Sequence, residues 1–403
     1  TIGAGVPGLP AGSYTLLPST YALLPGAFRI EINGQAGIAP AAPNAMRNGS
    51  WAASGRLSVA GTGIGDALSR QLIVTPASVL RSYSQYRETS YADFVRADAA
   101  RLDVPRAMLE ADARTMLVQL MPGNGDALDF RFQGQARFQP ADKGHGGTLA
   151  FPMDGGHLEV LAASGQASAD IGTASLRAVD VNAVGAARLS LGSLPVVRYG
   201  QGGNLLDFST GGAAGAITVR DGASLSAAEV LLIANSTVAN QGAGIKVEQG
   251  AAISTLGRGK SAFDAEDGFV YQPGYRGVLA VSNGRLQMLA PEYDSVGAPA
   301  SIRIGTCAQA ACAGATSLYS EGSIAFATSS AFELGDAVRY GTRHLTLAVG
   351  GINVGSAQAL DAAAARGALP PGLTSTLVAL DRLLRGDAST GAPALQTLSL
   401  TAA

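Results

Sequence analysis

The sequence predicts an all-β fold, a parallel β-helix in which short strands stack in successive coils. Residues 217–226 (ITVRDGASLS) and 245–254 (IKVEQGAAIS) share the pattern I-x-V-x-x-G-A-x-φ-S, 28 residues apart. Each copy joins a short alternating strand to a second apolar strand through a glycine turn. A third apolar run, 230–233, follows the first copy and ends near Asn235, for which we expect a structural role at a corner. Near-repeats of about 20–30 residues with tight corners are typical of solenoids.

The composition indicates a narrow core built from small residues. Only 14% of the 403 residues are charged, against about 25% in ordinary globular domains. The chain contains 53 glycines and a single tryptophan, Trp51. A hydrophobic content of 47% nevertheless predicts a folded chain rather than a disordered one.

The charge pattern argues against two classes of partner. The net charge is −2, and positive and negative residues are interspersed. Because the sequence has no basic stripe, we expect neither nucleic acid nor anionic lipid as a partner. No run of the sequence approaches the ~18 apolar residues of a membrane helix. The sequence begins at Thr1 rather than with Met or a charged signal peptide, so we expect a processed product or a fragment, with any export signal outside it.

Residues 1–87 are predicted to form an N-terminal β region that begins the solenoid. Two edge strands are expected at 14–18 and 21–25, where a proline follows Leu-Leu and disfavours helix. Residues 28–32 alternate between apolar and polar side chains and predict a strand. We expect a loop at 33–55 and further strands at 56–60 and 71–75.

Residues 88–122 are predicted to form a helical insertion on the flank of the solenoid. Thr89 or Ser90 can cap a first helix that has Asp93 in its first turn. A second helix is expected over 104–117, because apolar residues recur there at helical spacing. We expect this apolar face to pack on the protein itself rather than on a partner; it consists of Met108, Leu109, Met116, Leu117 and Leu120.

Residues 123–355 are predicted to form the coils of the β-helix, with an irregular stretch at 258–300. Strands that are this short and this often interrupted by glycine fit a solenoid better than a sandwich. Residues 356–403 are predicted to be helical or irregular and to cover the last coil. We expect one helix over 356–366, capped by Ser356, and another over 373–384, with Thr374 as a candidate cap.

The two cysteines, Cys307 and Cys312, are separated by four residues, and we expect them to form a disulfide. Free thiols and a metal site are the alternatives. A zinc site is disfavoured because it needs about four ligands, and the three histidines lie far apart in the sequence. A disulfide would place the protein outside the cytosol.

The tripeptide Arg385-Gly386-Asp387 is a candidate receptor-binding element, since some adhesins use Arg-Gly-Asp in an exposed turn. The alternative is that Gly386 simply ends the predicted helix, which is where glycine is expected. We favour the helix end.

A cluster of carboxylates, Asp264, Glu266 and Asp267, is a weak candidate for binding a hard cation such as Ca²⁺. The cluster lacks the spacing of a full calcium loop, because no distal Glu is in place. We favour a solvated turn and expect neither a metal nor a cofactor.

A β-helix can also carry a polysaccharide lyase or hydrolase, which needs carboxylates that converge on one face of a coil. Asp180, Asp207 and Asp221 lie in the relevant region, but their spacing does not force them together. The sequence contains no G-x-S-x-G, H-E-x-x-H or P-loop motif. We therefore expect no catalytic residues and no enzyme activity, and keep a carbohydrate-active enzyme as an alternative.

Three segments resemble a known family. Residues 9–29 (LPAGSYTLLPSTYALLPGAFR), residues 340–355 (YGTRHLTLAVGGINVG), and the pieces 369–373, 383–387 and 391–395 are similar to filamentous-haemagglutinin-type large exoproteins of Gram-negative bacteria. The resemblance implies a right-handed β-helix fibre that is secreted or held on the cell surface. It also implies two-partner secretion, meaning export through an outer-membrane transporter. The family's N-terminal secretion domain is not visible here, so the chain resembles a C-terminal region of such an exoprotein.

We therefore expect a structural segment of a bacterial surface fibre or adhesin, acting in adhesion, aggregation or biofilm formation. The alternatives are the carbohydrate-active enzyme and a filament-forming assembly subunit that associates with itself. The expected partners are a ligand on a host or neighbouring cell, or a polysaccharide, in addition to the transporter. We expect any specific contact site in the interruptions of the solenoid: 88–121, 258–276, the cysteine loop or the C-terminal end.

Overall fold

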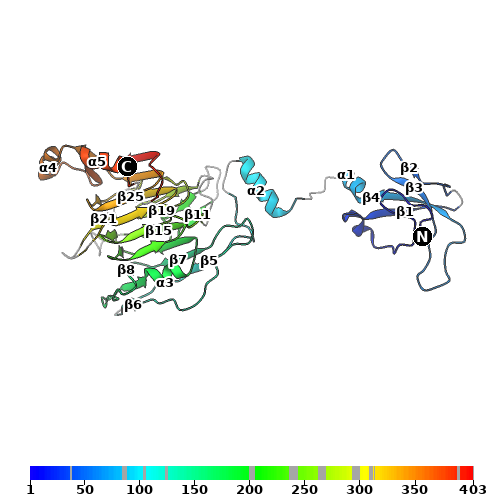
Figure 1. Cartoon of the computed structure of the whole chain (residues 1–403), viewed down its shortest axis with the longest axis horizontal. Helices are drawn as coiled ribbons and strands as arrows, with labels where there is room; N and C mark the ends of the chain where they lie inside the picture. The colour runs from blue at the N-terminus through cyan, green and yellow to red at the C-terminus, as the bar shows by residue number, and fades with distance from the viewer. Residues whose placement is uncertain are drawn as a thin grey trace. The chain divides into compact units, whose positions relative to one another are not determined.

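The chain folds into two compact units, Thr1–Ser90 and Tyr91–Ala403 (Figure 1). The structure is a computed structural model and describes residues 1–36, 39–83, 89–102, 106–122, 126–198, 205–235, 244–261, 269–292, 300–307, 312, 314–387 and 391–402. The protein is mostly β, with several parallel sheets, as the sequence predicts. None of the helices in these ranges is long and apolar enough to cross a membrane.

The N-terminal unit is built on one antiparallel sheet of order β1-β4-β3-β2. Its elements are η1 (Ser19–Leu23), β1 (Phe28–Ala36), β2 (Asn44–Ala45), β3 (Trp51–Gly55), β4 (Arg70–Pro76) and α1 (Ala77–Ser82). Its core lies within the unit and consists of Ile2, Val6, Ala53, Leu72 and Val74. The prediction that 1–87 begins the solenoid is therefore wrong, since every strand pair in this sheet is antiparallel.

Two predicted strands of this unit hold and three do not. The strand predicted at 28–32 is part of β1, and the one at 71–75 is part of β4. The strands predicted at 14–18 and 21–25 are absent, and a 3-10 helix, η1, occupies 19–23. Residues 56–60 make only one isolated bridge, while β3 lies in the predicted loop. The sequence pattern missed β3 because pairing with β4, more than 15 residues later, holds it.

The second unit, Tyr91–Ala403, contains four sheets. The eight-stranded sheet has the order β29-β26-β23-β19-β15-β10-β7-β5. Its strands are β5 (Thr115–Leu117), β7 (Thr148–Pro152), β10 (Arg188–Gly192), β15 (Glu229–Ala234), β19 (Gly277–Ser282), β23 (Ser323–Thr328), β26 (His344–Val349) and β29 (Thr397–Ala402).

The nine-stranded sheet, of order β27-β28-β24-β21-β16-β13-β8-β9-β6, is parallel throughout. Its strands are β6 (Leu128–Asp129), β8 (His157–Leu161), β9 (Thr173–Arg177), β13 (Ala216–Val219), β16 (Gly244–Glu248), β21 (Ser301–Thr306), β24 (Phe332–Leu334), β27 (Ile352–Gly355) and β28 (Leu373–Thr376).

Two smaller sheets complete the unit. The corner sheet is parallel and consists of β14 (Ser224–Ser226), β17 (Ala252–Ser254), β22 (Thr316–Tyr319) and β25 (Val338–Gly341). The side sheet consists of β11 (Val196–Arg198), β12 (Leu205–Asp207), β18 (Val270–Gln272) and β20 (Gln287–Met288). The chain passes repeatedly from the nine-stranded sheet through the corner sheet to the eight-stranded sheet, as in β13-β14-β15 and β24-β25-β26.

The near-repeat found in the sequence is confirmed in register. Ile217 pairs with Ile245, and Leu225 pairs with Ile253, each in a parallel ladder. Ile302 continues the first stack on the next strand. All five side chains are buried in the main core. The spacing of 28 residues thus places like side chains directly on one another inside the unit.

The middle of the eight-stranded sheet is buried on both faces, which explains the uninterrupted apolar run at 230–233. Val230 and Leu232 belong to the main core, whereas Leu231 and Ile233 pack under the side sheet. Strands that are covered on both faces are apolar throughout rather than alternating. The side sheet is the outer cover.

A buried ionic group lies between these two sheets. Arg188 and Glu229 pair across neighbouring strands, with 3.1 Å between Nη2 and Oε2. The Tyr271 hydroxyl of the side sheet donates to Glu229 Oε1 at 2.7 Å. Burial and the neighbouring Glu229 charge raise the pKa of the Tyr271 phenol. Because both charges are desolvated, removing either partner would leave the other uncompensated.

One strand breaks the parallel stacking. β19 runs antiparallel to both of its neighbours, β15 and β23. It lies between β18 and β20, which belong to the side sheet, so the chain enters the eight-stranded sheet here from its outer side. The stretch predicted to be irregular, 258–300, therefore contains three strands. An antiparallel ladder still pairs the backbone groups of both neighbours.

The predicted helical insertion at 88–122 is half correct. The first helix is confirmed as α2 (Tyr91–Leu102), with Asp93 in its first turn. The second helix is wrong, because 106–114 form turns and Thr115–Leu117 is β5. Of its predicted apolar face, Leu109 and Leu120 are buried while Met108, Met116 and Leu117 are exposed. Pairing of β5 with β7 overrides the helical pattern.

Another helix, α3 (Ala178–Ala183), lies within 123–355, where the sequence predicts the coils of the β-helix. It lies beside β14 of the corner sheet, because the Asn182 side chain donates to Ser224 O at 2.8 Å and accepts from Ser226 N at 2.9 Å. The Asn182 side-chain amide thus forms the two hydrogen bonds to β14 that the backbone of a neighbouring strand would otherwise form.

The C-terminal end contains strands as well as the predicted helices. α4 (Ala357–Ala365) is capped by Ser356, as predicted. α5 (Leu377–Arg385) begins later than predicted and is capped by Thr376 rather than Thr374. Residues 373–376 form β28 instead, and β29 adds an outer strand to the eight-stranded sheet. The prediction that 356–403 is only helical or irregular is wrong, because pairing with earlier strands extends both sheets.

The predicted disulfide is confirmed: Cys307 and Cys312 are bonded. The bond spans the connection between β21, in the nine-stranded sheet, and β22, in the corner sheet. It therefore closes a corner of one pass of the chain.

The stacked core leads to a first prediction. Ile245→Ala should lower the free energy of unfolding by about 2–5 kcal/mol, because it opens a cavity between the stacked side chains of the main core. The matched control is Lys246→Ala on the opposite face of β16. This variant should change the free energy of unfolding by less than about 0.5 kcal/mol. Urea unfolding followed by circular dichroism measures both. Equal losses in the two variants would contradict the inward stacking of Ile245.

Candidate functional site

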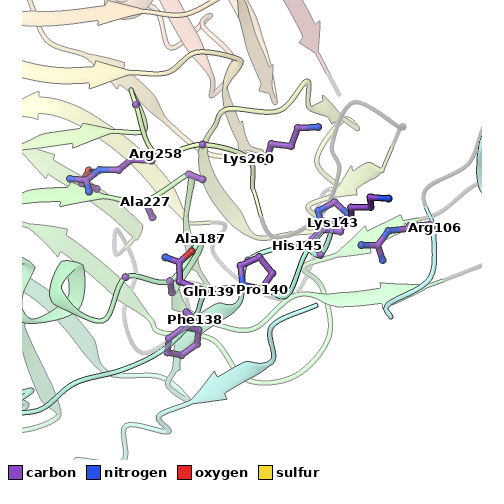
Figure 2. Close-up of a pocket in the computed structure, with 18 of the residues that line it drawn as sticks. Arg106, Phe138, Gln139, Pro140, Lys143, His145, Ala187, Ala227, Arg258 and Lys260 are labelled. Atoms are coloured by element: carbon purple, nitrogen blue, oxygen red, sulfur yellow. Dashed lines mark hydrogen bonds between the residues drawn. The ribbon is translucent and has the colours of Figure 1, made fainter. Parts of the chain in front are cut away.

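The second unit carries a groove of about 930 Å³ in which several cationic side chains gather (Figure 2). The groove is lined by α2, by the turn at 138–146, by the end of α3 and the residues after it, by 226–228 and by 257–260. Its basic lining residues are Arg96, Arg106, Lys143, His145, Arg258 and Lys260. None of the lining residues that the structure describes is Asp or Glu.

Not all of these charges are available to a ligand. Arg106 is held bidentately by Asp112, at 2.6 and 2.7 Å, and Arg96 pairs with Asp93 at 3.2 Å. Arg258 donates from Nε to the Ser226 hydroxyl at 2.6 Å, which leaves its charge uncompensated.

Lys143 and Lys260 are exposed and form no ion pair within the described ranges. The positive potential of the groove therefore comes mainly from Lys143, Arg258 and Lys260, in a protein whose net charge is −2. Uncompensated cations in a concave site concentrate the field and attract anions.

Asp112 fixes the wall of the groove. Besides Arg106, its carboxylate accepts from the backbone N–H of Leu109 at 2.7 Å and of His145 at 2.8 Å. Burial alone would raise the pKa of Asp112, but the hydrogen bonds from Arg106, Leu109 and His145 outweigh it and hold that pKa far below its usual value. One ionised carboxylate thus ties residues 106–112 to the turn that carries Lys143 and His145.

The turn at 141–144 is held close to this wall. Ala141 N donates to Ala111 O, and Gly144 N donates to Ala141 O, both at 2.9 Å. A Cβ at Gly144 would lie 2.1 Å from Ala111 O, so only glycine allows this approach. Lys143 itself has a positive φ of 61°, which directs the exposed side chain from a tight corner.

The floor of the groove consists of small residues. Gly185, Ala186 and Ala187 follow α3, and Ala227 and Ala228 connect β14 to β15. These side chains are too short to fill the space between the cationic side chains that line the groove. The groove is therefore open along its length.

Two of the four interruptions in which we expected a contact site contribute to this groove. Arg96 and Arg106 lie in the 88–121 stretch, and Arg258 and Lys260 lie in the 258–276 stretch. No pattern in the sequence indicated that Lys143 lies beside them. Lys143 and Arg258 are more than 100 residues apart, and only the adjacency of β7, β10 and β15 brings their connections together.

The Arg385-Gly386-Asp387 tripeptide lies at the end of α5. Gly386 has φ 58° and ψ −164°, a conformation that is almost restricted to glycine. Arg385 pairs with Asp381 at 2.8 Å. Asp387 accepts from the Tyr319 hydroxyl at 2.8 Å and donates its backbone N–H to Tyr340 O at 2.7 Å. This geometry fits the helix-end interpretation, and receptor binding stays a prediction.

The weak metal candidates Asp264, Glu266 and Asp267 lie outside the described residues. Within the ranges that are described, no group of three or more His, Cys, Asp or Glu side chains is placed to hold a metal ion.

The three aspartates considered for catalysis have different surroundings. Asp207 pairs with Arg198 in the side sheet at 2.7 Å, while Asp180 lies in α3 and Asp221 follows β13. The carboxylates that do converge are Glu159 and Glu248, which sequence reasoning missed. They share Arg220, at 2.9 and 3.2 Å, on adjacent strands of the nine-stranded sheet.

This carboxylate pair is an ion ladder rather than an acid–base pair. Burial alone would raise the pKa of Glu159, but hydrogen bonds from Ser175, the Ser168 backbone and Arg220 lower it. A general acid needs a raised pKa so that it holds a proton to donate. The geometry at Glu159 therefore gives no support to the enzyme alternative, which stays a prediction.

Comparison with protein-family models, with curated proteins and with solved structures found no match to the chain. The resemblance to filamentous-haemagglutinin-type exoproteins thus rests on the three sequence segments alone.

The contacts of Asp112 lead to a second prediction. Asp112→Asn should destabilise the groove wall by about 3–5 kcal/mol, because it leaves Arg106 buried without its counter-charge. Hydrogen exchange at the amides of Leu109 and His145 should accelerate. The control Asp93→Asn removes an exposed helix pair and should cost at most about 0.5 kcal/mol.

The same contacts predict a pH dependence. Because the pKa of Asp112 is lower in the folded state, its stabilisation is complete above the unfolded pKa of about 3.9 and is lost as the pH falls toward the folded pKa. Protection of the Leu109 amide, corrected for intrinsic exchange, should therefore decrease below about pH 4. The same decrease in Asp112→Asn would show that another group is responsible.

The tripeptide leads to a third prediction that separates its two interpretations. Asp387→Ala should lower stability by about 1–3 kcal/mol, because it leaves the largely buried Tyr319 hydroxyl without its acceptor. Arg385→Ala, on an exposed pair, should cost at most about 1 kcal/mol. Thermal unfolding measures both, and neither change should alter cell binding. Loss of cell binding in both variants would instead favour a receptor-binding element.

Proposed function

We propose that Tyr91–Ala403 is a right-handed parallel β-helix segment of a bacterial surface fibre or adhesin, acting in adhesion, aggregation or biofilm formation. The observation that carries the proposal is the in-register stacking of Ile217, Ile245 and Ile302 as the chain passes repeatedly through the nine-stranded, corner and eight-stranded sheets. A scaffold of this kind provides reach, and its sides carry whatever contact sites the protein has.

Three further observations support an extracellular structural role. The Cys307–Cys312 disulfide is expected in an oxidising compartment. The outward side chains of the nine-stranded sheet, such as Arg220 with Glu159 and Glu248, neutralise one another. The family resemblance at 9–29 and 340–355 implies export through an outer-membrane transporter and location on the bacterial surface.

The β19 reversal fits this proposal as an insertion in one coil. β18 and β20 leave the stack and form the side sheet, and β23 resumes parallel pairing with β26. Because each coil packs only on its neighbours, one altered coil does not prevent the next from stacking.

A second candidate function, the filament-forming subunit, is favoured by the outer strand β29. Among the described strands β29 pairs with β26, and most of its residues are exposed. A free strand edge is a template for pairing with another chain. Light scattering across a range of protein concentrations tests this candidate, which requires a mass that rises with concentration.

The surface-fibre proposal predicts where the protein acts. Antibodies against the second unit should label intact producing cells, and deletion of 91–403 should reduce cell–cell aggregation or biofilm. The matched control deletes the same length elsewhere in the parent protein. Labelling that appears only after lysis, or aggregation that the deletion leaves unchanged, would overturn the proposal.

A further inference from the structure

We infer that the groove lined by Lys143, Arg258 and Lys260 binds a segment of a linear anionic polysaccharide through its carboxylate or sulfate groups. The inference rests on the proposed function, since it names the ligand class of a surface fibre. It is carried by a different observation: cations that the protein leaves uncompensated line one open groove.

The distribution of the charges favours a polymer over a compact anion. In Figure 2, Arg258 lies at one side of the groove, Lys143 lies at the other, and Lys260 lies between them. Cations that surround a single small anion would converge on one point. Separated cations match an extended ligand that carries a negative charge on successive sugars.

Within the part of the chain that the structure describes, these three cations have no carboxylate partner, although other cations nearby do. Asp112 neutralises Arg106 in the same groove, and Arg220 is neutralised by Glu159 and Glu248 on the nine-stranded sheet. The contrast shows that carboxylates are available in this fold, but none of those in the described ranges is paired with Lys143 or Lys260. An anionic ligand would supply the missing partners.

The uncharged lining also suits a sugar chain. Gln139 is exposed at the groove and can offer both a donor and an acceptor to sugar hydroxyls. The floor of Ala187, Ala227 and Ala228 leaves room for pyranose rings. Arg258 adds a planar guanidinium that can pair with a carboxylate or sulfate in a fork.

The groove is less suited to single-stranded nucleic acid, the other linear polyanion. Sites for nucleic acid combine cations with aromatic side chains on which bases stack. The described lining residues include no Tyr or Trp; the phenyl ring of Phe138 packs against the main core, which leaves the His145 imidazole as the other aromatic ring. The observations thus favour the polysaccharide.

The test uses the full chain and three fluorescently labelled probes: polygalacturonate for carboxylates, dextran sulfate for sulfates, and neutral dextran. We expect one or both anionic probes to bind, neutral dextran not to bind, and affinity to fall as salt rises from about 50 to about 500 mM, because the contacts are screened. Comparison of the two anionic probes identifies the group that is recognised.

The variant K143E/K260E should weaken binding at least about tenfold, since it turns attraction at two positions into repulsion. The control, R366E, reverses one charge after α4, away from the groove, and should stay within about twofold; K143E alone, which makes the same change in charge, should weaken binding more than R366E does. Should K143E/K260E not fold by circular dichroism, K143S/K260S replaces it, with an expected loss of at least about fivefold.

Three outcomes would overturn the inference: neither anionic probe binds, K143E/K260E and R366E weaken binding equally, or a single-stranded oligonucleotide binds more tightly than both polysaccharides. The result of this binding test can be distinguished from the result of the test of the proposed function. Surface labelling of intact cells does not depend on the groove, so a surface fibre that fails to bind either probe would refute this inference alone.

Discussion

The stacking of like side chains on neighbouring strands is the constraint on which the rest of the second unit depends. Its interior is only as wide as the side chains that face inward, so each one must meet a partner of similar size on the next strand. Ile217, Ile245 and Ile302 satisfy this condition in one ladder. Because contacts of this kind are local, insertions at the connections alter the surface while the stack continues.

The sequence was informative where structure is set by neighbours at a fixed spacing, and uninformative where distant contacts decide it. The 28-residue repeat predicted the β13–β16 register correctly, because the apolar positions themselves define the pairing. The helix predicted at 104–117 failed because Asp112 binds Leu109 and the distant His145. Helical spacing alone carried no information about the His145 contact.

The groove could be predicted only as a region. Two walls of the groove lie in 88–121 and 258–276, which are interruptions of the predicted coils. Contact sites were expected in these interruptions. The third wall, with Lys143, follows from strand order rather than from any motif: β7, β10 and β15 are neighbours. Residues that meet only because their strands are neighbours have no characteristic spacing in the sequence. The net charge of −2 also does not reveal the local excess of positive charge in the groove.

The contrast between two arginines distinguishes scaffold from site. Arg220 directly follows β13 and pairs with Glu159 of β8 and Glu248 of β16, so its charge is neutralised at the end of three neighbouring strands. Arg258 lies in a connection after β17, where its Nε donates to the Ser226 hydroxyl, and it forms no ion pair with the described residues. Arg220 is therefore part of the scaffold, whereas the charge of Arg258 faces the groove. This division explains how one chain of low charge content combines a neutral β surface with a cationic groove.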